Sequence, residues 1–177
     1  MRTAILLGVM AAGVASAAAG RSLKDAPASL SSSVTLARAD EPGPRMLLTI
    51  VLVDASDKPV PNAVVYAYHT DARGSYGPGG NRDPRIFGYA RSDASGRLTL
   101  DTIKPGPYPE GGTAAHVHVH VAAAGREVVD ECWFTGDRYL RDEIRTREQA
   151  RGTLSRVITL TSDGARLRGT WTLSLGQ

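Results

Sequence analysis

The 177-residue sequence contains a single cysteine, Cys132, so no disulfide can form within the chain. Whatever stabilises the folded domain is therefore its packing or a metal ion. Cys132 lies between Glu131 and Trp133 in a strand-like run. This setting predicts a buried core thiol rather than a nucleophile.

No sign of charge dominates the sequence. Lys and Arg number 21 against 18 Asp and Glu, which gives a formal net charge of +3, and basic residues are scattered among acidic ones. Nucleic-acid binding usually requires a concentrated basic surface. We therefore expect no nucleic-acid partner.

Only one long apolar run occurs, shortly after Arg2. Its sequence "AILLGVMAAGVA" is followed by the small residues "SAAAG". The run is too short and too rich in alanine to span a membrane, and the pattern is that of a secretory signal peptide. We expect residues 1–19 to be a signal peptide, the protein to be exported to the periplasm or beyond, and no membrane association after cleavage.

The remaining sequence divides into a short linker and one domain. Residues 20–44 are rich in Ser, Ala and Pro without a sustained period, which predicts a linker. Residues 45–177 are long enough for one domain with a real core, and no repeat of 20 to 50 residues is visible.

Short β-rich runs separated by turn residues fill the expected domain. This spacing predicts an all-β fold, a single β-sandwich domain. The expected strands are residues 47–53, 63–69, 86–92, 97–103, 114–123, 128–134, 155–161 and 168–175. Only residues 136–152 show a helical pattern, which predicts one short surface helix.

Three of the four histidines alternate with valines in the run "HVHVHV". Side chains alternate between faces of a strand, so His116, His118 and His120 point the same way. Imidazoles two residues apart can converge on one metal ion. A solvated strand face that happens to carry histidines explains the same pattern, so both interpretations stay open.

Two tyrosines are the nearby candidates for further metal ligands. Tyr108 precedes the histidine strand, and Tyr76 lies in the turn "DARGSYGPGG". A phenolate is a hard donor with a high pKa, so it favours an acidic ion such as Fe(III) over zinc or calcium. Taken singly, each tyrosine is better explained as an ordinary half-buried ring with a satisfied hydroxyl.

The order of these motifs resembles a known family. The segments "VDASDKPVPNAVVYAYHTDARGSY", "RSDASGRLTLDTIKPGPYP", "AAHVHVHV" and "ECWFTGD" are similar to intradiol ring-cleavage dioxygenases, the non-haem Fe(III) enzymes that split catechols between their hydroxyls. The resemblance spans residues 47–137 and the closing strands. It is nearest to a compact, exported branch related to catechol 1,2-dioxygenase and protocatechuate 3,4-dioxygenase.

The resemblance implies a ligand set and a reaction. Tyr76, Tyr108, His116 and His118 match the family's iron ligands, while His120 lies outside the pattern. Tyr108 matches the tyrosine that leaves the metal and accepts a substrate proton. The implied cofactor is Fe(III), the implied partners are a small aromatic diol and dioxygen, and the product is a muconate-type diacid. An exposed edge strand would also allow a homodimer.

The chain departs from the family pattern at three points. Thr113 stands where the family usually has an arginine, Glu131 stands where it commonly has a glutamine, and the gap from Tyr108 to His116 is short, which predicts an open pocket. Arg85 and Arg91 are the candidates to replace the missing arginine. An alternative function is therefore a secreted β-sandwich module that binds a metal or a catechol and has lost ring cleavage. A third interpretation is a carbohydrate-binding or transthyretin-like sandwich with coincidental histidines.

Overall fold

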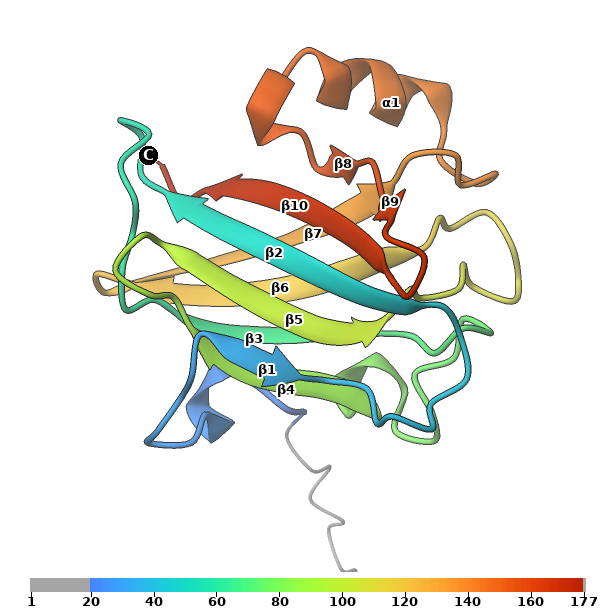
Figure 1. Ribbon diagram of the computed structural model, residues 1–177, viewed down its shortest axis with the longest axis horizontal. Helices are drawn as coiled ribbons and strands as arrows, with labels where there is room; N and C mark the ends of the chain where they lie inside the picture. The colour runs from blue at the N-terminus through green and yellow to red at the C-terminus, as the bar shows by residue number, and fades with distance from the viewer. Residues whose placement is uncertain (1–19, 177) are drawn as a thin grey trace, which may run out of the picture.

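The computed structural model describes residues 20–176 and arranges their strands in two sheets that pack face to face (Figure 1). The first sheet has the strand order β1-β5-β2-β10-β9. Its strands are β1 (Ser33–Thr35), β5 (Arg97–Ile103), β2 (Arg45–Val53), β10 (Leu167–Ser174) and β9 (Thr161–Ser162). The predicted all-β sandwich is confirmed.

The second sheet carries the histidine strand at its centre, in the order β4-β3-β6-β7-β8. Its strands are β4 (Ile86–Arg91), β3 (Val64–His69), β6 (His116–Ala123), β7 (Arg126–Phe134) and β8 (Val157–Ile158). The run predicted as one strand over residues 155–161 is split between the sheets as β8 and β9. The described residues also contain three short 3-10 helices, η1 (Leu23–Asp25), η2 (Gly80–Arg82) and η3 (Gly152–Leu154).

The core lies between the two sheets and is built by alternation along the strands. In β2, Met46, Leu48, Ile50 and Leu52 are fully buried, and the residues between them are half-buried. Burying one such side chain contributes about 1.5–3 kcal/mol. In β6 the valines face this core, so the histidines of the same strand are directed to the outer face of the second sheet.

Residues 20–44 are part of the folded domain, and the predicted linker is wrong. β1 pairs in parallel with β5, with Val34 opposite Leu100, and Leu36 and Ala37 are buried in the core. Short strands rich in Ser and Ala lack a strong periodic signal, so their incorporation depends on the partner strand β5 rather than on local sequence. Residues 1–19, for which the sequence predicts a signal peptide, lie outside the described residues.

One α-helix, α1 (Asp142–Gln149), lies beside β8 at the end of the sandwich (Figure 1). This confirms the predicted short surface helix. Its one buried side chain is Glu148, whose carboxylate accepts hydrogen bonds from the backbone N–H and the guanidinium of Arg156 at 2.9 and 2.8 Å. No helix in residues 20–176 is long and apolar enough to cross a membrane.

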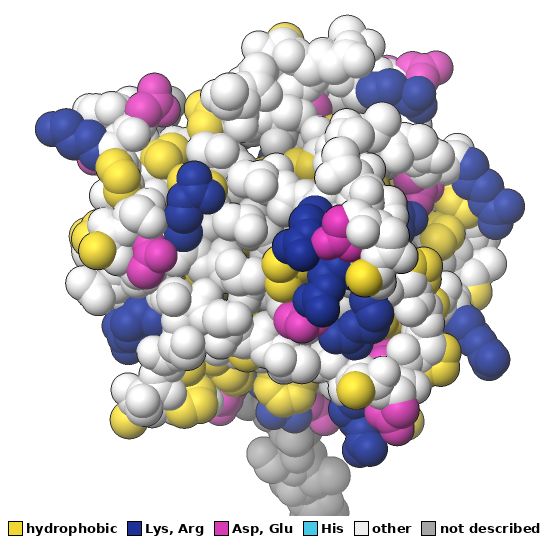
Figure 2. All heavy atoms as spheres, viewed as in Figure 1, with side chains coloured by type: hydrophobic (Ala, Val, Ile, Leu, Met, Phe, Trp, Pro, Cys, Tyr) yellow, Lys and Arg dark blue, Asp and Glu magenta, His cyan; other side chains and the backbone are white. Residues whose placement is uncertain are grey.

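The surface of the first sheet mixes charges of both signs. Figure 2 shows basic and acidic side chains beside one another on this face, and no histidine. Arg45 and Arg166 both contact Asp101, at 2.5 and 3.4 Å. Cys132 is fully buried and unpaired, as the sequence predicted, and burial raises the pKa of its thiol.

Candidate metal centre

Strand pairing places the histidines of β6 between two neighbours on the outer face of the second sheet. His118 lies opposite Tyr68 of β3 on one side and opposite Glu131 of β7 on the other. The start of β6 is fixed by Asp137, whose carboxylate accepts the backbone N–H of Ala115 at 3.0 Å. The histidine positions are therefore set by the ladder of the sheet.

The two candidate tyrosines are brought together by two interlocked loops. A Cβ on Gly74 would lie 1.9 Å from the carbonyl oxygen of Pro107, and a Cβ on Gly106 would lie 2.4 Å from that of Ala72. The N–H of Gly106 donates to the carbonyl of Asp71 at 2.9 Å. Only residues without a side chain allow this approach, so the loops carrying Tyr76 and Tyr108 dock backbone to backbone.

The four predicted ligands converge in the structure. His116 Nε2 lies 2.9 Å from His118 Nε2, which lies 3.1 Å from the Tyr76 hydroxyl, which in turn lies 2.8 Å from the Tyr108 hydroxyl. Donor atoms that share one ion at ~2.0–2.1 Å stand about 3 Å apart, so this spacing fits a first coordination shell. The residues present therefore fit a metal ion.

The imidazole rings are oriented so that the same nitrogen of each faces the cluster. His116 donates its Nδ1–H to the carbonyl of Ala114 at 2.7 Å, which leaves the lone pair on Nε2. Burial, and then the neighbouring imidazoles, lowers the pKa of His118 to about 3. Both features suit metal binding, because only a neutral imidazole can act as a ligand.

As metal ligands, the two phenols would require an ion of strong Lewis acidity. Burial raises the pKa of Tyr76 far above its ordinary value, and the hydrogen bond with Tyr108 raises it further. Such a phenol ionises near neutral pH only when a metal ion replaces its proton. Hard oxygen donors of this kind favour a ferric ion.

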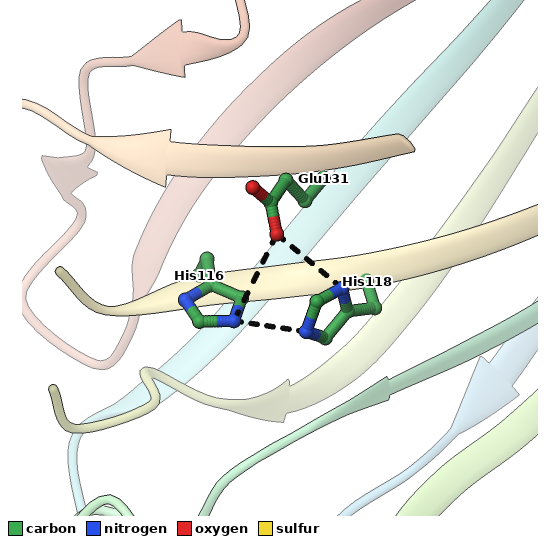
Figure 3. A group of neighbouring side chains, drawn as sticks. All are labelled: His116, His118 and Glu131. Carbon is green, nitrogen blue, oxygen red and sulfur yellow. Dashed lines mark hydrogen bonds and ion pairs between the residues drawn. The ribbon is translucent and has the colours of Figure 1, made fainter. Parts of the chain in front are cut away.

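Glu131 also belongs to this cluster, which the sequence showed only as a departure from the family pattern. Its carboxylate oxygen lies 3.4 Å from His118 Nδ1 and 3.9 Å from His116 Nε2. Figure 3 shows the carboxylate directed at both rings. Within residues 20–176, His116, His118 and Glu131 form the one group of His, Cys, Asp and Glu side chains close enough to hold a metal ion.

Tyr68 is a site residue that the sequence reasoning missed. Its ring stacks on the His118 ring, with centroids 4.8 Å apart and planes at 22°, and it is only 9% exposed. Burial raises the pKa of its phenol. The available signal was the alternation of Tyr66 and Tyr68 in "VVYAYH", which places two large rings on the same outer face as the histidines.

The other residues singled out from the sequence stay apart from the donor cluster. His120 packs edge-on against Tyr66, with centroids 5.6 Å apart, so it adds to the aromatic wall. Arg85 pairs with Glu41 at 2.5 Å and approaches Asp71 at 3.6 Å. Arg91 donates to the carbonyl of Asn62. Neither arginine is directed at the four ligands.

A cleft opens beside the two tyrosines. Its volume is about 240 Å³, and its lining residues are Gly74, Ser75, Tyr76, Gly80, Tyr108, Pro109 and Glu110. A second cleft of about 400 Å³ lies between α1 and the end of β7 and contains none of the four ligands. We therefore associate the smaller cleft with the metal centre.

The fold and the donor set define a class, a β-sandwich protein in which two tyrosines and two histidines converge as candidate metal ligands. A family profile described as "Dioxygenase" (Dioxygenase_C) matches residues 22–172. The chain is 30% identical over 124 residues to the chlorocatechol 1,2-dioxygenase of Rhodococcus opacus, covering 58% of this chain and 48% of that protein. It is 32% identical over 112 residues to the protocatechuate 3,4-dioxygenase beta chain of Burkholderia cepacia, covering 55% and 48%.

Solved structures share the same fold. The dioxygenase domain of a carbohydrate-binding fusion protein from Streptomyces sp. SirexAA-E superposes with a TM-score of 0.63 at 25% identity, covering 80% of this chain and 86% of that one. An intradiol ring-cleavage dioxygenase from Tetranychus urticae superposes with a TM-score of 0.61 at 22% identity, covering 79% and 84%. The chain belongs to the intradiol dioxygenase family. It spans about half the length of the curated relatives it matches.

Proposed function

We propose that this protein is an exported ferric dioxygenase that cleaves a catechol-type ring between its two hydroxyls to give a muconate-type diacid. The observation that carries the proposal is the convergence of two imidazole nitrogens and two phenol oxygens at spacings of 2.8 to 3.1 Å. Family membership supports catechol chemistry in general, since relatives bear the names chlorocatechol 1,2-dioxygenase and catechol 1,2-dioxygenase.

The proposed cofactor is Fe(III), held by Tyr76, Tyr108, His116 and His118. When bound, a ferric ion supplies the Lewis acidity that stabilises a catechol dianion and lets its ring donate electron density to dioxygen. Two phenolates and two neutral imidazoles would neutralise only part of the 3+ charge of a ferric ion. The substrates are accordingly an aromatic diol and dioxygen.

Tyr108 is the proposed catalytic residue. It lies at the end of the row of donor atoms, where its hydroxyl contacts that of Tyr76, and it borders the cleft of about 240 Å³. As a phenolate it can accept a hydroxyl proton from a diol that enters this cleft. The loop that follows it carries Gly111 and Gly112, both at φ 78°, so the ring sits on a segment built from residues of wide conformational freedom.

Two further residues shape the site. Tyr68 holds the His118 ring by stacking, and Pro109 provides an apolar edge to the cleft. A cleft of this size suits a single aromatic ring, since drug-sized ligands occupy ~300–1,000 Å³.

A second candidate function, metal or catechol binding without ring cleavage, is favoured by one specific observation. Thr113 stands at the position of the usual arginine, and Arg85 is neutralised by Glu41 and Asp71. Removing one well-placed group that stabilises developing charge costs ~3 kcal/mol of transition-state energy. This second function predicts substrate binding without oxygen consumption.

The experiment that separates the two functions records the visible spectrum of the iron-loaded protein while oxygen is followed. A phenolate-to-iron band that shifts with catechol or hydroxyquinol, followed by oxygen uptake, supports the dioxygenase. A band that shifts without uptake supports the binding module, and a colourless protein rejects both. Tyr108→Phe should lose the uptake and weaken the band, whereas Tyr89→Phe, a ring whose hydroxyl donates to the carbonyl of Ser22, should retain both.

Export is proposed from the sequence pattern of residues 1–19 alone. Expression of the full chain in a bacterial host should release a protein whose N-terminus begins near residue 20. Retention of residues 1–19 on the purified protein would reject the signal peptide.

A further inference from the structure

Glu131 is a partly buried carboxylate that has no lysine or arginine partner among residues 20–176. Its side chain is 32% exposed, and in residues 20–176 its ion-pair contacts are only with His116 and His118. Burying a carboxylate costs free energy unless its charge is paired. A metal ion bound by the two histidines would supply the positive charge that this carboxylate lacks.

Other carboxylates of similar exposure are paired with arginine. Asp101, at 31% side-chain exposure, contacts Arg45 at 2.5 Å, and the more buried Glu41 contacts Arg85 at the same distance. Glu131 differs from these two carboxylates, because the side chains that approach it are imidazoles. Its position is not adjustable, because the ladder between β6 and β7 sets it directly opposite His118.

The two histidines differ in how their Nδ1 atoms are held. His116 Nδ1 has the carbonyl of Ala114 as its acceptor at 2.7 Å. For His118, Glu131 lies 3.4 Å from Nδ1 while Nε2 faces the Tyr76 hydroxyl at 3.1 Å. An acceptor on one ring nitrogen fixes the tautomer and directs the lone pair of the other nitrogen to the metal.

We propose that Glu131 is a positioning residue of the metal centre, which accepts the Nδ1–H of His118 and places an extra negative charge beside the bound ion. The carboxylate makes the His118 imidazole a stronger donor and lowers the Lewis acidity of the metal. This inference rests on the metal site of the proposed function. It differs from that function in assigning Glu131 no contact with the substrate.

The first test uses the protein loaded with Ga(III), a diamagnetic trivalent ion, and follows the Nδ1–H proton of His118 by ¹⁵N-resolved NMR. In the native protein and in Glu131→Gln, which keeps an acceptor oxygen, this proton should exchange slowly with water, whereas in Glu131→Leu it should exchange rapidly. Glu127→Gln is the matched control, because Glu127 lies on the same strand and four residues away, ~13 Å along β7. Equal exchange rates in the native protein and in Glu131→Leu would overturn the positioning role.

The second test uses the iron-loaded protein. Glu131→Gln should move the phenolate-to-iron band to longer wavelength and raise the iron reduction potential, because a negative charge is removed. Glu131→Leu should bind iron ~10–100-fold more weakly, and Glu127→Gln should match the native protein. An unchanged band and potential in Glu131→Gln would overturn the proposal, as would complete loss of the band, which would make Glu131 a direct ligand.

The two tests separate this inference from the proposed function. A native protein that binds Ga(III) but consumes no oxygen when loaded with iron contradicts the dioxygenase, while the exchange rate of the His118 Nδ1–H still reports on Glu131. A coloured, oxygen-consuming native protein whose spectrum is insensitive to Glu131→Gln contradicts the inference alone.

Discussion

The hydroxyl oxygens of Tyr76 and Tyr108 lie 2.8 Å apart, although the residues are 32 positions apart in the chain. Neither residue lies on a strand, so the sheet ladder does not set this distance. It depends on the docking of two loops at Gly74 and Gly106. We therefore expect the tyrosine half of the candidate metal centre to be more sensitive to backbone changes than the histidine half.

Gly106→Ala should separate the two tyrosines. The new methyl group would lie 2.4 Å from the carbonyl oxygen of Ala72, so the loops must move apart, at a cost of about 1–3 kcal/mol in unfolding free energy. We expect a weaker phenolate-to-iron band in addition to the lower stability.

Gly169→Ala is the control for this change. Gly169 lies on β10, and its new methyl group would meet the flexible side-chain ends of Leu160 and Ile158 and no residue of the tyrosine loops. It should alter stability without altering the band. An unchanged band in Gly106→Ala would contradict the docking argument.

The charge around the cleft should discriminate among catechols. Glu131 lies beside the histidines, Glu110 lines the cleft, and no arginine stands at position 113. A catechol whose ring carries a carboxylate should therefore bind about 5–10-fold more weakly than catechol, a difference of ~1 kcal/mol. The reason is that its negative charge is repelled by Glu131 and Glu110. Spectral titrations with catechol and 3,4-dihydroxybenzoate measure it, and tighter binding of the acid would refute the prediction.

Removal of the buried Glu148 carboxylate should loosen α1. Its side chain is fully buried and accepts hydrogen bonds from Arg156, so Glu148→Ala leaves this guanidinium with one partner fewer. We expect a loss of about 3 kcal/mol in unfolding free energy. Glu143→Ala, an exposed change on the same helix, should cost little. Equal denaturation midpoints for the two variants would show that the buried pair is dispensable.

His69 should make the fold sensitive to acid. It is fully buried, donates Nδ1–H to the carbonyl of Thr70 at 2.6 Å, and accepts from Thr102 at 2.7 Å. Burial lowers the pKa of this imidazole to about 4, below its ordinary value of 6.5. Between pH 6.5 and 4 the unfolded chain binds a proton that the folded chain does not, so stability present above pH 6.5 is lost on acidification, by up to about 3 kcal/mol.

The measurement for His69 is the unfolding free energy of the native protein and of His69→Gln from pH 7.5 to 4.5. The variant has no imidazole to titrate at this position, so its stability should fall less steeply over that interval. Parallel curves would place the acid sensitivity elsewhere.

Much of the sheet architecture was predictable from local patterns. The alternation of histidines and valines in β6 predicted that they occupy opposite faces, because the period of two is a property of any strand. The same patterns gave no sign of β1, whose three residues become a strand only by pairing with β5. They also joined β8 and β9 into one run, since the change of sheet between them depends on neighbours that are distant in sequence.

The sequence by itself determined the candidate ligands and their order, two tyrosines and a His-x-His pair, and placed the valines on the strand face opposite to the histidines. Only the tertiary structure decided which atoms meet. It brought Glu131 against His118 through the register of β6 and β7, stacked Tyr68 on the same ring, and engaged Arg85 with Glu41 away from the centre. Strand alternation is a local property of the backbone, whereas these contacts arise between segments that approach only when the sandwich closes.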